Sequence, residues 1–134
     1  MRRWLRWTGF VCLVGIVSIG AAYAWQDDDK IQLDSRQIML AKVRHAKSLV
    51  EGLALENHET IAVAAQGLMS LSQESAWRVI QTPEYLSMSD EFRSSAERLR
   101  DAANQENIDL ATLAYFEVTL NCVRCHKYLR RQRK

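Results

Sequence analysis

The stretch IDLATLAYFEVTLNCVRCHKYLRR, residues 108–131, decides how the rest of the chain is interpreted. Its apolar residues recur every three or four positions, which predicts a helix from Ile108 to Arg131, capped by Asn107 or Asp109. These apolar positions fall on two faces of the helix. One face comprises Leu113, Phe116, Leu120 and Val123, and the other comprises Ala111, Tyr115, Val118, Cys122, Cys125 and Leu129. A helix that is apolar on two faces is expected to contact its neighbouring helices with one face and a further apolar group with the other.

Within this stretch, the segment NCVRCH, residues 121–126, places two cysteines three positions apart and a histidine directly after the second. A Cys-x-x-Cys-His run is the signal for covalent attachment of a c-type haem. On a helix, this spacing lets Cys122 and Cys125 bond to the two vinyl groups of one porphyrin, while His126 presents its imidazole to the iron. The motif therefore predicts one covalent haem c with His126 as its proximal ligand, and the haem is the additional contact of the helix.

Three other interpretations of these residues have less support. A thioredoxin-like redox pair lies at a helix start after a strand, whereas this pair lies near the end of a long helical segment. A zinc site needs a fourth ligand, and the other histidines, His45 and His58, are far upstream. A structural disulfide is compatible with an exported protein, but it would leave His126 without a role.

The first 24 residues are typical of a secretory signal peptide. The first six residues include three arginines, residues 11–20 are apolar, and Ala22-Tyr23-Ala24 matches a cleavage site. The apolar stretch is shorter than the roughly 20 residues that span a membrane, so cleavage is favoured over an uncleaved membrane anchor. The third cysteine, Cys12, falls in this leader. We expect a mature domain of residues 25–134 in the periplasm, since haem is attached outside the cytoplasm.

Removal of the leader changes the charge of the protein. The whole chain has 18 Lys plus Arg and 16 Asp plus Glu, and the leader holds three arginines and no acidic residue. The mature chain then has a formal charge of minus one, which argues against nucleic-acid binding. Its basic residues gather in a C-terminal tail that comprises Lys127, Arg130, Arg131, Arg133 and Lys134. This basic tail is either a solvated helix end or a docking patch for acidic surfaces on redox partner proteins.

The rest of the mature chain predicts three further helices and no strand. The first lies between Asp34 and Asn57, and its start is capped by Asp34 or Ser35. Its expected inward stripe comprises Ile38, Met39, Val43, Ala46, Leu49, Val50 and Leu53. The second helix runs from Asn57 to about Ser72, and Thr82-Pro83 caps and begins a third that runs to about Asn104. Four such helices with short loops predict an all-α, antiparallel four-helix bundle with haem c on its C-terminal helix.

With the haem signal on the last of four helices, the chain resembles the class II c-type cytochromes, the group of cytochrome c-prime and cytochrome c-556. The resemblance covers the layout of the mature chain, and its most specific part is residues 122–126. In the first helix, Arg36-Gln37 is similar to the Arg-Gln pair that lies beside the haem propionates in this family. The resemblance thus implies a propionate contact for Arg36, although a solvated first-turn arginine is as good an explanation.

The resemblance implies two options for the iron position opposite His126. In the c-556-like branch a methionine of the first helix ligates the iron, whereas in the c-prime branch an apolar side chain covers an open position. The family register places Leu40 at this point, with Met39 one residue earlier. Because Met39 lies on the expected inward stripe and a thioether binds haem iron well, we expect Met39 to be the distal ligand. The simpler alternative is that Met39 is an ordinary core residue.

These options predict different functions. With Met39 on the iron, the protein is an exported monohaem cytochrome that carries electrons between redox partners. With an open position under Leu40, it is a c-prime-like protein that binds nitric oxide or carbon monoxide. The sequence contains no recognisable catalytic constellation, so we do not expect an enzyme. Homodimers occur in the family that the chain resembles, but the sequence has no evident exposed apolar stripe that would require a dimer. His45 lies off the expected inward stripe and is expected to be solvated.

Overall fold

The computed structural model describes residues 34–74 and 80–132. The expected signal peptide, Cys12 and the last two residues of the basic tail lie outside the described residues. The chain divides into two compact units, Met1–Arg36 and Gln37–Lys134, and the second unit contains the bundle. The described residues form four α-helices and no strand, which confirms the all-α fold class.

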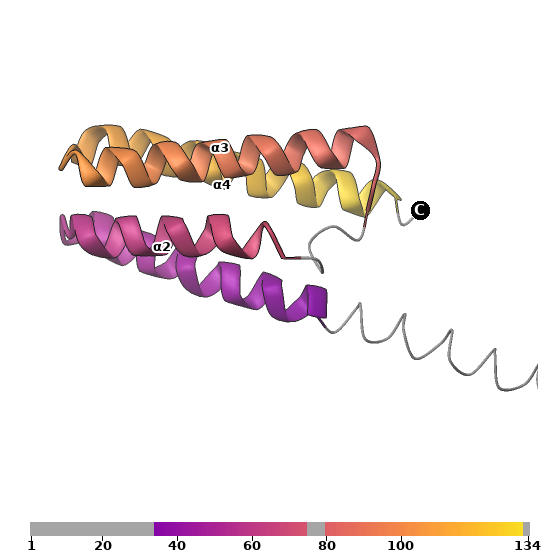
Figure 1. The fold of residues 1–134 in the computed structure, drawn as a ribbon, viewed down its shortest axis with the longest axis horizontal. Coiled ribbons are helices and arrows are strands. Elements are labelled where there is room, and N and C mark those ends of the chain that lie inside the picture. Colours follow the sequence, from indigo (N-terminus) through magenta and orange to yellow (C-terminus); the bar gives the residue numbers. More distant parts are fainter. Residues whose placement is uncertain (1–33, 75–79, 133–134) are drawn as a thin grey trace, which may run out of the picture. The chain divides into compact units, whose positions relative to one another are not determined.

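The helices follow one another as an up-down bundle. The first helix covers residues 34–54 of the described chain, so Asp34 and Ser35, the two expected caps, already lie within it. The others are α2 (His58–Leu71), α3 (Pro83–Asn104) and α4 (Ile108–Gln132). Helix α2 packs against α3, α3 packs against α4, and successive helices run in opposite directions (Figure 1). The predicted bounds of α2, α3 and α4 are correct to within a residue.

A Glu-Asn pair makes the turn between the first helix and α2. Glu56 has a φ of 50°, in the left-handed region. The backbone N–H of Asn57 donates to the carbonyl of Gly52 at 2.8 Å, which closes the end of the first helix. The Asn57 side chain then accepts from the N–H of Thr60 at 2.9 Å, as a helix N-cap does. The same two residues therefore end one helix and start the next.

The turn between α3 and α4 repeats this arrangement. Glu106 has a φ of 54°, and the N–H of Asn107 donates to the carbonyl of Ala102 at 3.0 Å. The Asn107 side chain accepts from the N–H of Leu110 at 2.9 Å. Of the two caps expected for this helix, Asn107 is the one observed, while Asp109 lies in the first turn where its charge suits the helix dipole.

Helix α3 begins beside the end of α4. Thr82 is its N-cap and accepts from the N–H of Tyr85 at 3.3 Å, and Pro83 occupies the first turn, as predicted. The Thr82 hydroxyl also lies 2.7 Å from the Tyr128 hydroxyl of α4. This hydrogen bond places the start of α3 next to the part of α4 that carries the Cys-x-x-Cys-His run.

The core between the helices is aliphatic and rich in alanine, which allows a close approach of the helix backbones. Leu49 and Ile61 are fully buried, and Phe92 closes the cluster on the side of α3. The remaining buried members are Ala64, Ala65, Leu68, Ala96, Leu99, Ala102, Ala103, Ala111, Ala114 and Val118. Burial of this apolar surface is the main force that holds the bundle together.

The first helix is rotated relative to the expected inward stripe. Val43 and Val50 are half exposed, whereas Ile38, Lys42 and Leu49 are buried. Met39, Ala46 and Leu53 lie at the edge of the buried face and are partly buried. The prediction that Val43 and Val50 point inward is therefore wrong.

Two close approaches between the first helix and α2 explain this rotation. A Cβ on Gly67 would collide with the His45 imidazole, and one on Gly52 would lie 2.8 Å from Cγ1 of Ile61. The two glycines thus let a ring and a branched side chain pack directly on the opposite backbone, which selects the face that turns inward. The expectation that His45 is solvated is wrong, because its ring is partly buried over Gly67.

Only one of the two apolar faces of α4 packs against the described helices. Ala111, Ala114, Val118 and Cys125 are buried. The other face, Leu113, Phe116, Leu120 and Val123, is between 57% and 63% exposed. An exposed apolar stripe of this length was not expected. Among the described residues, no helix has the length and the apolar character to cross a membrane.

Candidate functional site

The residues of the Cys-x-x-Cys-His run lie in the second half of α4. Cys125 is buried, while Cys122 and His126 are exposed. Both cysteines are free thiols. Because Cys122 is three residues from Cys125 and four from His126, all three occupy adjoining positions on one side of the helix. The sequence prediction placed this group on the correct helix.

Helix α3 holds the motif in place through two of its neighbouring polar side chains. The amide nitrogen of Asn121 donates to the backbone carbonyl of Glu91 at 3.3 Å and to the Ser95 hydroxyl at 3.1 Å. Arg124, which lies between the two cysteines, donates to Oε2 of Glu91 at 2.6 Å. The α4 segment that presents the thiols is thus fixed against α3 on both sides of Cys122.

An open groove runs between α3 and α4 on the outer side of this contact. It is lined by charged and polar side chains, among them Arg98 and Glu117, which form an ion pair at 2.6 Å. Arg124 and Glu91 form a second pair across it. Charge pairs therefore cross this groove, and neither thiol lines it.

Lys42 is the residue that sequence reasoning missed. It belongs to the first helix, is only 8% exposed, and extends into the bundle. Its Nζ donates to the Ser72 hydroxyl at 2.9 Å and lies 4.0 Å from the centre of the Phe92 ring. Ser72, the C-cap of α2, itself donates to the Leu68 carbonyl at 2.7 Å. One amine of the first helix thus contacts both α2 and α3.

The charge of the Lys42 amine also reaches groups on α4. It acts on the thiols of Cys122 and Cys125 and on the imidazole of His126. The Lys42 amine thus contacts α2 and α3 and acts on α4 through its charge. A signal for this lay in the sequence, because Ile38, Lys42, His45 and Leu49 follow one another at alternating spacings of four and three.

The surroundings favour the neutral form of each ionisable group at the site. Burial lowers the pKa of Lys42 to about 7, although the neighbouring thiols oppose this change. Partial loss of surrounding water raises the pKa of Cys122, although the residue is exposed, and burial raises the pKa of Cys125. The Lys42 charge opposes both shifts. The pKa of the exposed His126 is lowered first by partial loss of surrounding water and then by the charges of Arg130 and Lys42. A neutral imidazole is the form that binds a metal.

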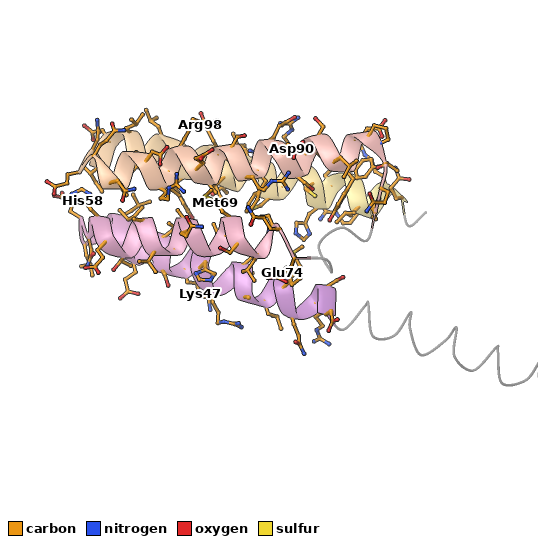
Figure 2. The ribbon with its side chains drawn as sticks, viewed as in Figure 1. Lys47, His58, Met69, Glu74, Asp90 and Arg98 are labelled. Atoms are coloured by element: carbon orange, nitrogen blue, oxygen red, sulfur yellow. The ribbon has the colours of Figure 1, made fainter. Side chains whose placement is uncertain are left out.

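The other predicted site residues are placed as follows. Met39 is partly buried and precedes Lys42 by three positions, so the two lie on the same side of the first helix. Leu40 is 52% exposed and lies on the opposite side of that helix. Arg36 is exposed and belongs to the other compact unit, so its contact with a propionate stays a prediction. His58 lies at the far end of the bundle from Glu74, which follows Ser72 (Figure 2).

The donor set fits a covalent haem better than a bound metal ion. Among the residues that the structure describes, no three His, Cys, Asp or Glu side chains could together hold a metal ion. The Cys-Cys-His group therefore does not converge on one point as a zinc site requires. Haem attachment asks for two thiols one helical turn apart and a single neutral imidazole, which Cys122, Cys125 and His126 provide.

The fold and this site define the protein as an all-helical four-helix domain with a Cys-x-x-Cys-His run on its last helix. No protein-family model, curated protein or solved structure matches the chain.

Proposed function

We propose that this protein is an exported c-type cytochrome that carries electrons between redox partner proteins through one covalently attached haem. The observation that carries the proposal is the Cys-x-x-Cys-His run on α4, whose two thiols are free and lie one turn apart on the helix. When bound, the haem supplies a reversible one-electron couple. Cys122 and Cys125 would hold the porphyrin, and His126 would be the proximal iron ligand.

The rest of the chain contributes rigidity and shielding. The contacts of Asn121 and Arg124 with α3 hold the attachment segment still, which suits a carrier that changes oxidation state with little rearrangement. The aromatic side chains of Tyr85 and Phe92 are buried on the part of α3 whose Glu91 contacts Asn121 and Arg124. They exclude water from the inner side of the site, and exclusion of water is one of the factors that tune the potential of a haem.

The exposed cations near the end of α4 are suited to partner docking. Lys127, Arg130 and Arg131 are exposed and follow the motif directly. Together with the last two residues of the basic tail, they would attract acidic surfaces on redox partners to the end of the helix that carries the haem. The leader, with its cleavage site, supports a periplasmic location.

The alternative, a gas-binding protein with an open iron position under Leu40, has less support. A covering side chain has to point toward the site, and Leu40 is half exposed on the outward side of the first helix. Met39 lies partly buried on the same side of that helix as Lys42. The electron carrier is therefore the better proposal.

Production of the full chain in cells that contain haem-attachment machinery tests the proposed function. The protein should keep its haem after denaturing electrophoresis, as shown by haem staining, and should be reduced and reoxidised reversibly. The double variant C122S/C125S should lose the stain, because no thiol remains to bond the vinyl groups. The matched control C12S should keep it. Unmodified protein without covalent haem would overturn the proposal.

A further inference from the structure

We propose that a second copy of this chain covers the exposed apolar face of α4, so that two α4 helices pack against each other in an antiparallel dimer with two-fold symmetry. This surface is separate from the thiols and the imidazole of the proposed haem site, and the contact does not need the haem. The residues that form it are the exposed apolar stripe and one charged residue beyond each of its ends: Asp109, Leu113, Phe116, Leu120, Val123 and Lys127.

The first argument is the spacing of the apolar stripe. Its four residues, from Leu113 to Val123, follow one another at intervals of three, four and three positions. This repeat brings apolar side chains to one seam between two paired helices. The four side chains are between 57% and 63% exposed. Within the part of the chain that the structure describes, the bundle packs against the other face of α4, so the seam is available to a further helix.

The second argument is the charge at the two ends of the stripe. Asp109 precedes Leu113 by four residues and Lys127 follows Val123 by four, so both continue the same seam. Both are exposed, and neither forms an ion pair with another residue that the structure describes. The seam thus has an acidic end and a basic end at equal distances from its middle. Its charges are complementary to a second copy of the same helix that runs in the opposite direction.

One antiparallel register satisfies the whole seam. With the two-fold axis midway between Phe116 and Leu120, Phe116 faces Leu120 of the second copy. Leu113 then faces Val123 of the second copy, and Asp109 faces its Lys127. Each contact occurs twice, as two-fold symmetry requires. A parallel pair would instead place each charged residue beside its own copy, so the charges select the antiparallel orientation.

The size of the seam predicts a dimer that dissociates on dilution. From Asp109 to Lys127 the seam is about 27 Å long, at about 1.5 Å per residue. Four apolar side chains from each copy make a contact at the small end of specific interfaces. The exposed ion pairs add little affinity and mainly set the orientation. Arg131 and the last two residues of the basic tail follow the seam in the sequence and are left for redox partners.

Analytical ultracentrifugation of the full-length protein over a wide range of concentrations tests the dimer. The unmodified protein should have twice the mass of one chain at high concentration and approach the mass of one chain on dilution. F116S and L120S should each stay monomeric, because a hydroxyl replaces a central apolar contact. Both side chains are exposed in the single bundle, so the helix content seen by circular dichroism should not change. The matched control V63S, which alters an exposed apolar residue of α2, should still dimerise.

Exchange of the two terminal charges tests the orientation. D109K and K127D each place like charges opposite one another in the antiparallel dimer and should each raise its dissociation constant about tenfold. The double variant D109K/K127D restores two opposite pairs with reversed signs and should dimerise as the unmodified protein does. K47D, which alters an exposed lysine of the first helix (Figure 2), should have no effect on the dissociation constant.

Three outcomes would contradict the inference. A protein that is monomeric at every concentration overturns it, and binding of that monomer to neutral phosphatidylcholine vesicles would assign the stripe to a lipid surface. A dimer that persists in both F116S and L120S forms through another face. Single charge variants that dimerise normally, or a double variant that does not recover, overturn the antiparallel register. None of these results depends on the haem stain, so the proposed function is tested separately.

Discussion

Single side chains at the thiol end of the bundle show how burial sets their ionisation. Lys42 and Tyr85 carry ionisable groups in the interior, and in each the protein favours the neutral form. The cost of an interior charge is the common cause, since a low-dielectric environment disfavours the charged state of acids and bases alike. The helices that enclose these two groups therefore decide whether each group is charged or neutral at a given pH.

Tyr85→Phe should reduce the loss of stability that we expect of the unmodified protein in alkali. Burial raises the pKa of Tyr85 from 10.0 to about 12, and the nearby Cys125 thiol adds to this effect. Between these two pH values the unfolded chain loses the phenolic proton while the folded protein keeps it. The free energy of unfolding therefore falls as the pH rises above about 10, by a total of about 2 kcal/mol near pH 12.

Urea unfolding of both proteins at about pH 9 and about pH 11 measures this difference. The unmodified protein should lose more stability than Tyr85→Phe over this interval. Equal losses in the two proteins would show that Tyr85 does not retain its proton on folding.

At the scale of the elements, the two helical hairpins are closed by the same pair of residues. In each turn a glutamate has a positive φ, and an asparagine follows it. The asparagine donates its backbone N–H to a carbonyl at the end of one helix, and its side chain caps the start of the next. The left-handed region costs about 1 kcal/mol for a residue with a Cβ, and glycine is the usual residue there. Neither hairpin contains glycine at that position. The turns are thus determined by the asparagine cap at the expense of some backbone strain.

Glu56→Gly and Glu106→Gly should each stabilise the protein by about 0.5 kcal/mol. Each substitution relieves the strain of a positive φ, and part of the gain is offset because glycine makes the unfolded chain more flexible. Thermal unfolding should show a small rise in Tm for each variant and an additive rise for both, since the turns are separate. Gln105→Gly, next to the second turn with a negative φ, should lower the stability instead. A fall in Tm for both glutamate variants would contradict this explanation.

At the scale of the whole molecule, the end of the bundle that carries the thiols is closed by a hydrogen bond between distant residues. The hydroxyls of Thr82 and Tyr128 lie 2.7 Å apart and join the start of α3 to the last turns of α4. Tyr128 follows His126 by two residues, so this contact also limits the motion of the predicted iron ligand.

Tyr128→Phe should lower the free energy of unfolding by about 1 kcal/mol, which is the usual contribution of one hydrogen bond. Thr82→Ala should cost more, about 1–2 kcal/mol, because it removes both this bond and the N-cap of α3. The double variant should be less destabilised than the sum of the two, since the shared bond is lost only once. Strict additivity in this cycle would show that the two hydroxyls do not interact in solution.

The sequence by itself determined the local features of this protein. The caps at Thr82 and Asn107, the bounds of three helices and the placement of the two cysteines on the last helix all depend on residues a few positions apart. Backbone hydrogen bonding and helical spacing act over that range, so periodicity and capping residues are sufficient to predict them.

Only the tertiary structure decided which face of the first helix turns inward. Apolar residues occupy more than half of its circumference, so the stripe through Val43 and the stripe through Leu49 were both compatible with its periodicity. The choice depends on Gly52 and Gly67, which allow Ile61 and His45 to pack on an opposite backbone. That contact brings Lys42 into the core and leaves Leu40 outside. Packing between residues far apart in the chain made this decision, because the local pattern is compatible with either face.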